Sequence, residues 1–396
     1  MQKSLTMNPI NNISFAQGNL KILTVIGARP QIIKAAALSR AIKNSFPDSV
    51  SEKILHTGQH YDSNMSQVFF DELGIPRPDF NLHVGSGSHG VQTAKMIEGI
   101  EEVLQAEHFD ALVVYGDTNS TLAGAVAASK LHVPVIHIEA GLRSFNMTMP
   151  EEQNRIVCDQ LSNLLFAPTE TGMENLRTEG FMNSKATFVG GRKRRIYNSG
   201  DIMYDNSMYF ASVSDSKTSI LKDNMLHDGN FVLATIHRDN NTDSPERLTD
   251  IFRALLQISE QSKVVLPLHP RTAKLLEKNL ESSVYSKLQT SDVKILPPAS
   301  FLEMIALEKN AKIVLTDSGG VQKEAYYFRK PCVIMRPETE WVEIVNHGCG
   351  VVSDADCGKI LDAYDLLTGK DCDFPPIFGN GKAAEFILEK TVEYFQ

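Results

Sequence analysis

Short apolar runs separated by amphipathic, helix-like stretches are the feature that most constrains how this chain can fold. Alternation of this kind predicts a parallel β-sheet with helices on both faces, because strands buried on both sides read as continuous apolar segments. The strands expected in the first half are Leu20–Ile26, Lys53–His56, Ala111–Tyr115, Val133–Ile138 and Leu164–Phe166.

The same alternation begins again in the second half, so the chain is expected to build the same kind of domain twice. Its 396 residues exceed what one hydrophobic core usually serves. The predicted fold class is therefore α/β, with two Rossmann-like, doubly wound parallel-sheet domains and a cleft between them. The strands expected in this half are Phe231–Thr235, Lys263–Leu268, Val293–Leu296, Lys312–Leu315 and Cys332–Met335.

Domain boundaries are expected where this periodicity fails. Residues 1–19, rich in Asn, Ser and Gln, are expected to form a flexible N-terminal extension, and 20–190 the first domain. Residues 191–206 are predicted to be a linker, in which the run Arg192-Lys193-Arg194-Arg195 is interpreted as a solvated basic face without function. The second domain is expected over 207–376, and the last helical pattern, within 377–396, is predicted to pack elsewhere.

Composition excludes several classes of function. The formal net charge of −9 argues against a nucleic-acid or anionic-membrane surface. The chain contains no apolar run of about 18 residues and no signal-peptide pattern at its start, so a cytoplasmic protein acting on soluble molecules is expected. The five cysteines show neither CxxC nor Cys/His spacing, which predicts reduced thiols and no metal site.

The ends of the predicted strands carry candidate anion sites, because ligands of open α/β sheets bind outside the carboxyl ends of the strands. After the first strand, Arg29 and Lys34 flank a helix start at Pro30, where free N–H groups and basic side chains favour an anion. The segment lacks GxGxxG, so no nicotinamide cofactor is expected.

The strand ending at Leu315 precedes a second candidate turn, Ser318-Gly319-Gly320. Its two glycines let backbone amides approach a diphosphate, and Glu324 lies one helical turn further on, where it could hold ribose hydroxyls. Taken alone, such a turn is equally well read as a plain loop. Opposite another anion-binding turn, it indicates a nucleotide-diphosphate site.

Three carboxylates, Asp117, Glu139 and Glu151, also follow predicted strands or begin a helix near them. Carboxylates that share a crevice raise one another's pKa, which suits a site that must both accept and return a proton. The alternative is that they form salt bridges with Arg143 and Arg155.

Two histidines and one arginine complete the strand-end positions. His237 ends the first strand of the second half, where it could reach a phosphate or a leaving oxygen, although a lone histidine is more often structural. His269 and Arg336 follow later strands and are predicted to contact the nucleotide or to close the cleft. GxSxG, P-loop and HExxH motifs are absent, which removes the usual support for hydrolases and kinases.

These strings resemble the non-hydrolysing UDP-N-acetylglucosamine 2-epimerase family, from about residue 21 to the C-terminus. Within that family the chain is most similar to the UDP-2,3-diacetamido-2,3-dideoxyglucuronate 2-epimerase branch, through His56-Thr57-Gly58-Gln59-His60, Ser144-Phe145-Asn146 and Thr339-Glu340-Trp341. The family motifs are Gly27-Ala28-Arg29-Pro30, Gly116-Asp117-Thr118, Glu139-Ala140-Gly141-Leu142-Arg143, Pro150-Glu151-Glu152-Gln153-Asn154-Arg155, His237-Arg238 and Asp317-Ser318-Gly319-Gly320.

The resemblance implies a GT-B architecture with the active site in the cleft, a C-terminal helix that crosses back to the N-terminal domain, and a homodimer. It implies a reaction without cofactor or metal, in which UDP is eliminated to give a glycal and is then added back. It assigns acid–base roles to Asp117, Glu139 and Glu151, and a role at the leaving group to His237. The predicted substrate contacts are Arg29, Lys34, Arg143, His269, Ser318, Gly319, Gly320, Glu324 and Arg336.

One departure from the family pattern bears on regulation. Members activated by UDP-N-acetylglucosamine carry Gln-His-Arg where this chain has Gln59-His60-Tyr61, so activation by substrate is not expected. The substituents at carbons 3 and 6 of the sugar stay open. Three rival functions also stay open: a GT-B glycosyltransferase, a non-catalytic UDP-sugar sensor, and a hydrolysing 2-epimerase that releases UDP.

Overall fold

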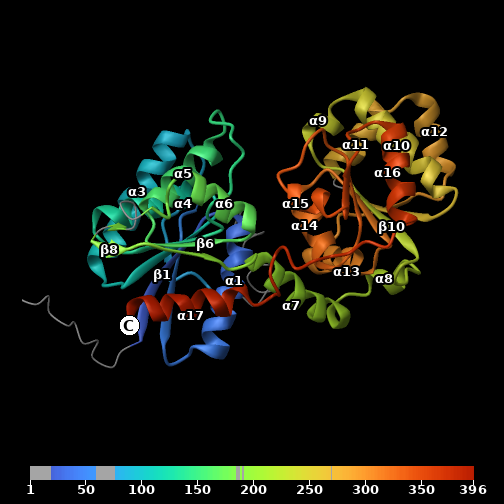
Figure 1. The fold of residues 1–396 in the computed structure, drawn as a ribbon. Helices are drawn as coiled ribbons and strands as arrows, with labels where there is room; N and C mark the ends of the chain where they lie inside the picture. Colours follow the sequence, from blue (N-terminus) through green and yellow to red (C-terminus); the bar gives the residue numbers. More distant parts are fainter. Residues whose placement is uncertain (1–18, 59–75, 184–187, 190, 269) are drawn as a thin grey trace, which may run out of the picture.

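The structure, a computed structural model, describes residues 19–58, 76–183, 188–189, 191–268 and 270–396. They form two lobes, each built around a twisted sheet (Figure 1). The predicted flexible extension, apart from Asn19, lies outside the described residues. Among the described helices, none combines the length and apolar composition needed to cross a membrane.

A parallel sheet of seven described strands forms the first lobe, in the order β3-β2-β1-β4-β5-β6-β9. Residues of β1 alternate between two cores: Ile22 and Ile26 pack on one face, Leu23 and Val25 on the other. The strands are β1 (Leu20–Ile26), β2 (Val50–His56), β3 (Phe80–Asn81), β4 (Ala111–Tyr115), β5 (Val135–Ile138), β6 (Leu164–Ala167) and β9 (Arg195–Asn198). The described helices of this lobe are α1 (Arg29–Ser45), α3 (His89–Ala106), α4 (Asn119–Lys130), α5 (Pro150–Leu161) and α6 (Glu170–Thr178).

The second lobe repeats the plan with a parallel sheet of six described strands, in the order β12-β11-β10-β13-β14-β15. The predicted α/β class with two parallel sheets is therefore confirmed. The strands are β10 (Phe231–Thr235), β11 (Lys263–Pro267), β12 (Lys294–Leu296), β13 (Ile313–Thr316), β14 (Cys332–Ile334) and β15 (Gly350–Val352). The helices are α9 (Asp239–Thr242), α10 (Pro245–Ser259), α11 (Pro270–Asn279), α12 (Ser282–Thr290), α13 (Phe301–Asn310), α14 (Gly319–Tyr327), α15 (Val342–Asn346) and α16 (Cys357–Thr368).

Helices α7 (Ile202–Lys217) and α17 (Ala383–Phe395) join the lobes. The α17 side chains enter the core beneath the first sheet, beside α1 and α7 (Figure 1). Asp205 of α7 accepts hydrogen bonds from the N–H groups of Ala383 (3.0 Å) and Ala384 (2.7 Å), so it caps the start of α17. In the other direction, α7 reaches the second lobe, where Phe210 packs edge-on against Phe301 of α13 at 5.2 Å. The short helix α8 (Ile220–Asp223) follows α7.

The stretch predicted as the linker, 191–206, contains structure that the sequence pattern missed. Its residues Arg195–Asn198 are β9, the edge strand beside β6, and Arg192–Lys193 form β8, which pairs with β7 (Phe188–Val189). The basic run is not a uniformly solvated face. Arg194 is buried over the ring of Phe181, while Arg192 and Arg195 lie over the aromatic rings that end α17.

Candidate active site between the two sheets

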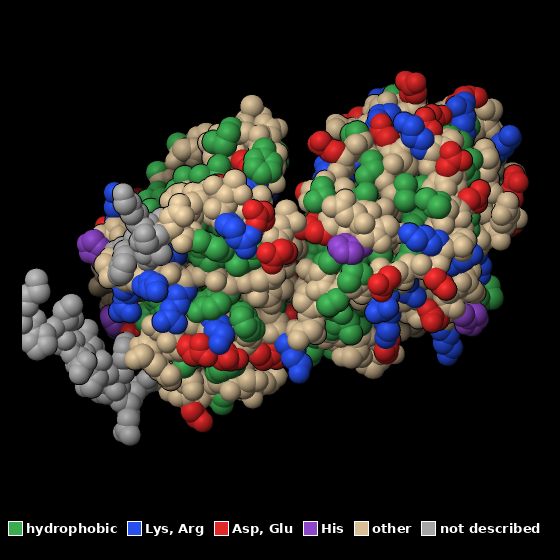
Figure 2. Space-filling model, in the orientation of Figure 1, with side chains coloured by type: hydrophobic (Ala, Val, Ile, Leu, Met, Phe, Trp, Pro, Cys, Tyr) green, Lys and Arg blue, Asp and Glu red, His purple; other side chains and the backbone are tan. Residues whose placement is uncertain are grey.

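The two sheets place their strand ends at one cavity between the lobes. In each sheet the strand order reverses at the first strand, which pairs with one later strand on each side. Strand β1 lies between β2 and β4, and β10 lies between β11 and β13. Such a switch point opens a crevice at the carboxyl ends of the strands. A cavity of about 720 Å³ lies there, lined by Arg29 from the first lobe and by His237, Ser318 and Glu324 from the second. Figure 2 shows the notch between the lobes on one face of the molecule.

The turn between β1 and α1 is held by a buried glutamine. The Gln31 Oε1 atom accepts hydrogen bonds from the N–H groups of Gly27 (2.9 Å) and Ala28 (3.1 Å), and its amide nitrogen donates to the Tyr115 carbonyl (2.9 Å) at the end of β4. Gln31 therefore ties together the two strand ends that bracket the first crevice. Arg29, which follows Ala28 in the chain, is exposed and lines the cavity, as the sequence predicts.

A buried carboxylate plays the same part in the second lobe. Asp317, at the end of β13, accepts hydrogen bonds from the N–H groups of His237 (3.0 Å) and Arg238 (3.1 Å) and from the side-chain amide of Asn241 (3.0 Å). These bonds fix the segment after β10 against the start of α14. They explain why the exposed side chain of His237 and the Ser318 turn line the same cavity.

At the start of α14, Gly319 lies close to a side chain, whereas Gly320 has room for a Cβ atom. A Cβ atom on Gly319 would lie 2.3 Å from Glu340 Oε1, so a side chain at this position would displace the Glu340 carboxylate. Glu340 accepts a hydrogen bond from Arg336 Nη1 at 2.8 Å, which places the predicted ligand Arg336 beside this helix terminus. The N–H groups of the helix start favour an anion, and here the Glu340 carboxylate, paired with Arg336, lies beside them.

Glu139 lies in a strained conformation between two lysines. Its φ angle of 73° is in the left-handed region, which costs energy for a residue with a side chain. One of its carboxylate oxygens pairs with Lys34 of α1, and the other is 3.8 Å from Lys323 Nζ of α14. The predicted phosphate contact Lys34 is thus buried and paired with Glu139. Lys323, which sequence reasoning missed, also pairs with the buried Asp201 at 2.6 Å.

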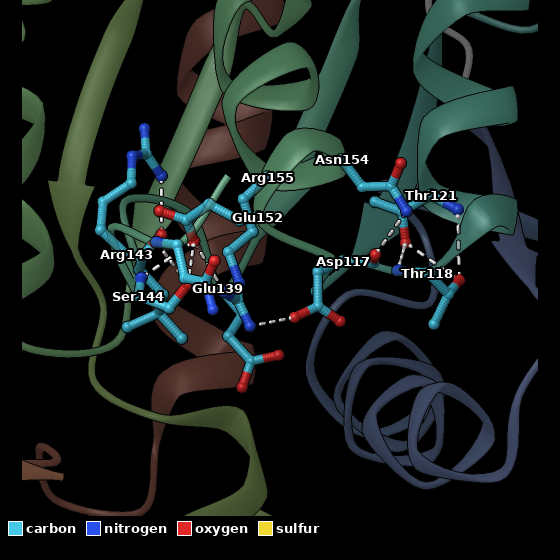
Figure 3. A network of polar contacts seen from close by, with 12 residues as sticks. Asp117, Thr118, Thr121, Glu139, Arg143, Ser144, Glu152, Asn154 and Arg155 are labelled. Carbon is cyan, nitrogen blue, oxygen red and sulfur yellow. Dashed lines mark hydrogen bonds and ion pairs between the residues drawn. The ribbon is translucent and has the colours of Figure 1, made fainter. Parts of the chain in front are cut away.

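Asp117 joins a network centred on Arg155 (Figure 3). The guanidinium of Arg155 contacts Asp117 Oδ2 at 2.5 Å and Glu152 Oε2 at 2.9 Å. Glu152 is buried and also accepts hydrogen bonds from the N–H and hydroxyl of Ser144 (2.9 and 3.0 Å). Its neighbour Glu151, the predicted acid–base residue, is exposed at the start of α5. The contact between Asp117 and Arg155 is one that the salt-bridge alternative expects, and the acid–base role of Asp117 stays a prediction.

The predicted substrate contact Arg143 is used inside the first lobe. Its side chain is 1% exposed and pairs with the fully buried Asp159 at 2.8 Å and with Glu179 at 2.6 Å. Asp159 also accepts hydrogen bonds from His137 Nδ1 (2.8 Å) and Gly141 N (3.1 Å). These contacts hold the loop that carries Glu139, and the predicted role of Arg143 as a substrate contact stays a prediction.

Sequence reasoning missed Glu152, Arg155 and Asp159 as an organising group. These residues recur at i, i+3 and i+7 along α5, and a polar stripe with that spacing beside a crevice is a readable signal of an inward face. Lys323 and Asp201 left no such signal, because they meet only through the tertiary fold. The predicted contact His269, and the segment at Gln59 proposed to lack the regulatory site, lie outside the described residues.

Comparison with known proteins identifies the family. The UDP-N-acetylglucosamine 2-epimerase model matches residues 43–391. This chain belongs to that family. It is 49% identical over 372 residues to UDP-2,3-diacetamido-2,3-dideoxy-D-glucuronate 2-epimerase of Pseudomonas aeruginosa, covering 93% of this chain and 99% of the relative.

Solved structures of family members have the same fold. The crystal structure of Methanocaldococcus jannaschii UDP-GlcNAc 2-epimerase in complex with UDP-GlcNAc and UDP is 38% identical, with a TM-score of 0.76, over 94% of this chain and 100% of that one. The enzyme from Neisseria meningitidis bound to UDP-GlcNAc is 26% identical, with a TM-score of 0.78, over 94% and 100% of the two chains. The predicted family, GT-B fold and enzyme class, an isomerase, are confirmed.

Proposed function

We propose that this 2-epimerase inverts carbon 2 of a UDP-linked 2-acetamido sugar by eliminating UDP to a glycal and adding it back. The observation that carries the proposal is the cavity between the lobes, where Arg29 faces His237 and the start of α14. Family members are bound to UDP-GlcNAc or UDP in solved structures, which supports placing the nucleotide in this cavity.

The proposed chemistry needs two proton-transfer groups and a well-held leaving group. A base removes the proton from carbon 2 while the bond between carbon 1 and oxygen breaks, and its electron pair leaves with UDP. Return of a proton to the opposite face of carbon 2, with re-addition of UDP at carbon 1, gives the epimer. We assign the proton transfers to Asp117, Glu139 and Glu151.

Stabilisation of departing UDP falls to the second lobe. The first turn of α14 and Arg29 would hold the diphosphate, and His237 would meet the leaving oxygen, where negative charge grows as the bond breaks. Donors placed at such a charge contribute about 10²-fold or more to the rate. The Lys34 and Lys323 side chains would hold the Glu139 carboxylate in place before substrate binds.

For the substrate, we propose UDP-2,3-diacetamido-2,3-dideoxyglucuronate, with UDP-N-acetylglucosamine as the alternative. The 49% identity to the Pseudomonas aeruginosa enzyme of that name, over nearly all of both chains, supports this choice. We further propose that the protein is a cytoplasmic homodimer that supplies a precursor for a cell-surface polysaccharide.

The test is to incubate the purified protein with each nucleotide sugar and to follow the configuration of carbon 2 by proton NMR. Inverted UDP-sugar, with free UDP as a minor product, is expected. Free UDP without inverted UDP-sugar would instead identify a hydrolysing enzyme, and no change in either sugar would favour the transferase or sensor.

Variants connect the activity to the site. Asp117→Asn is expected to lower kcat about 10²-fold or more while the protein still binds UDP. Glu170→Gln, at the 73% exposed start of α6, is the matched control and should retain full activity. Equal activity of the two variants would contradict the assignment of Asp117.

A further inference from the structure

Two carboxyl groups from neighbouring helices line the cavity. On α13, the cavity-lining residues are Phe301, Met304, Ile305 and Glu308, which share one helix face because they recur at i, i+3, i+4 and i+7. Glu308 ends this face. Glu324 of α14 lines the same cavity.

Glu308 is a buried carboxyl group with an oxygen that lacks a hydrogen-bond partner within the described residues. The residue is 1% exposed, and its Oε2 atom has no hydrogen-bond partner within the described part of the chain. Buried polar atoms are nearly always paired, and leaving one unpaired costs stability. A carboxyl group in this position therefore lowers the stability of the unliganded fold, and a bound molecule could supply the missing hydrogen bond.

The protonation of the pair favours binding of hydroxyl groups. Burial, with repulsion by Glu324, raises the pKa of Glu308 well above its ordinary value. Burial raises the pKa of Glu324 to about 7, although Lys323 opposes this shift and Asp201 adds to it. Glu308 is also close enough to the Cys332 thiol to help raise the pKa of that thiol. Near neutral pH the pair thus offers one carboxylic acid, a donor, beside a carboxyl that can accept.

We infer that Glu308 is a ligand for the ribose of the nucleotide, donating its acid O–H to one ribose hydroxyl while Glu324 accepts from the other. The inference rests on the proposed function only in that the cavity takes UDP. Glu324 lies five residues beyond Gly319, about 7.5 Å along α14, so the ribose, which is bonded to the diphosphate, meets the carboxyls first. The uracil base would then occupy the apolar part of the cavity at Pro298 and Ala299.

Calorimetric titration of the full-length protein with UDP, 2′-deoxy-UDP and 3′-deoxy-UDP tests this inference. The wild-type protein is expected to bind at least one deoxy form about tenfold more weakly than UDP, the loss of about one hydrogen bond. Glu308→Met, which keeps the volume but removes the donor, should bind UDP about tenfold more weakly and lose most of that preference. Glu308→Gln keeps a donor and should stay within a few-fold of wild type.

A thermal melt of the unliganded variants separates a binding role from a structural one. Glu308→Met should melt at or above the wild-type temperature, because it replaces an unpaired buried carboxyl with an apolar group of similar size. Equal wild-type affinity for UDP and both deoxy forms would overturn the inference. An unchanged preference for UDP over its deoxy forms in Glu308→Met would do the same. A further titration with CDP would also overturn the inference if Glu308→Met lost a wild-type preference for UDP over CDP, because Glu308 would then contact the base.

Failure of the proposed function gives a different result. UDP binding without inversion of either sugar would contradict the epimerase proposal, while the comparison of UDP with its deoxy forms would still decide the role of Glu308. Wild-type protein that does not bind UDP at all would overturn both.

Discussion

Replacing Asp159 with Asn should destabilise the first lobe far more than replacing Glu179, although both carboxylates bind Arg143. Asp159 is fully buried, whereas the side chain of Glu179 is 31% exposed. Burial acts to raise the pKa of Asp159, but His137 and Arg143 hold it below its ordinary value, so the folded protein carries a carboxylate here. The other ring nitrogen of His137 faces the Gly116 carbonyl at 2.8 Å, so both ring nitrogens face acceptors.

The expected cost follows from what asparagine cannot do. Its oxygen can accept from only one side, so its NH₂ group must face another donor, either His137 or Arg143. The variant thus removes the fully buried carboxylate from Arg143, which keeps only its partly exposed partner Glu179, and sets an amide donor against another donor. Breaking a buried pair in this way costs on the order of 3–5 kcal/mol. Glu179→Gln removes a partly exposed pair and should cost about 1 kcal/mol or less.

Urea unfolding, followed by far-UV circular dichroism, measures the free energy of unfolding of both variants and of wild type. Activity adds a second readout, since Asp159 also fixes Gly141 in the loop that carries Glu139. Asp159→Asn should lower kcat even at temperatures where the protein is folded, and Glu179→Gln should not. Similar losses of stability in the two variants would refute the reasoning from burial.

Three further predictions concern other ionisable side chains. Lys323→Met should cost about 3–5 kcal/mol by leaving Asp201 unpaired, and adding Asp201→Asn should recover most of the loss; strictly additive costs in a double-mutant cycle would contradict the pairing. Burial raises the pKa of Glu52 from 4.5 to about 7, so the folded state holds the proton more tightly and stability falls as pH rises through this window. Glu52→Gln should therefore stabilise the protein at about pH 8, by at most about 3 kcal/mol, and raise its melting temperature there. At about pH 5 the melting temperature should rise little or not at all, and an equal rise at both pH values would argue against the raised pKa. Asp205→Ala should cost about 1 kcal/mol and speed amide exchange at the start of α17 while α10 is unaffected; unchanged exchange would show that the cap is dispensable.

The fold could be predicted from sequence because strands buried on both faces are continuous apolar runs. The strand Phe231–Thr235, for example, has the bounds that its apolar residues indicate. An edge strand with few apolar residues escaped the same reasoning, although the edge strand Lys294–Leu296 was predicted within Val293–Leu296. Among the described strands, Arg195–Asn198 has a neighbour on one side only, and it contains polar residues that face solvent, so its pattern resembles a loop.

Site residues could be predicted where strand topology alone determines their position. Arg29 and His237 line the cavity because each follows the first strand of its sheet. The inward member of the pair Glu151 and Glu152 could not be predicted, since one residue along a helix turns the side chain by about 100°. The pairing of Arg143 with Asp159 was equally hidden, because it depends on how α5 packs beneath the loop after β5.

The central claim, inversion of carbon 2 through removal and return of its proton, is tested most directly by running the reaction in D₂O with UDP-2,3-diacetamido-2,3-dideoxyglucuronate and following carbon 2 by NMR. The account predicts deuterium at carbon 2 of the inverted UDP-sugar, and its loss in Asp117→Asn. Inverted product that keeps the original hydrogen, or no exchange with this sugar or with UDP-N-acetylglucosamine, would contradict it.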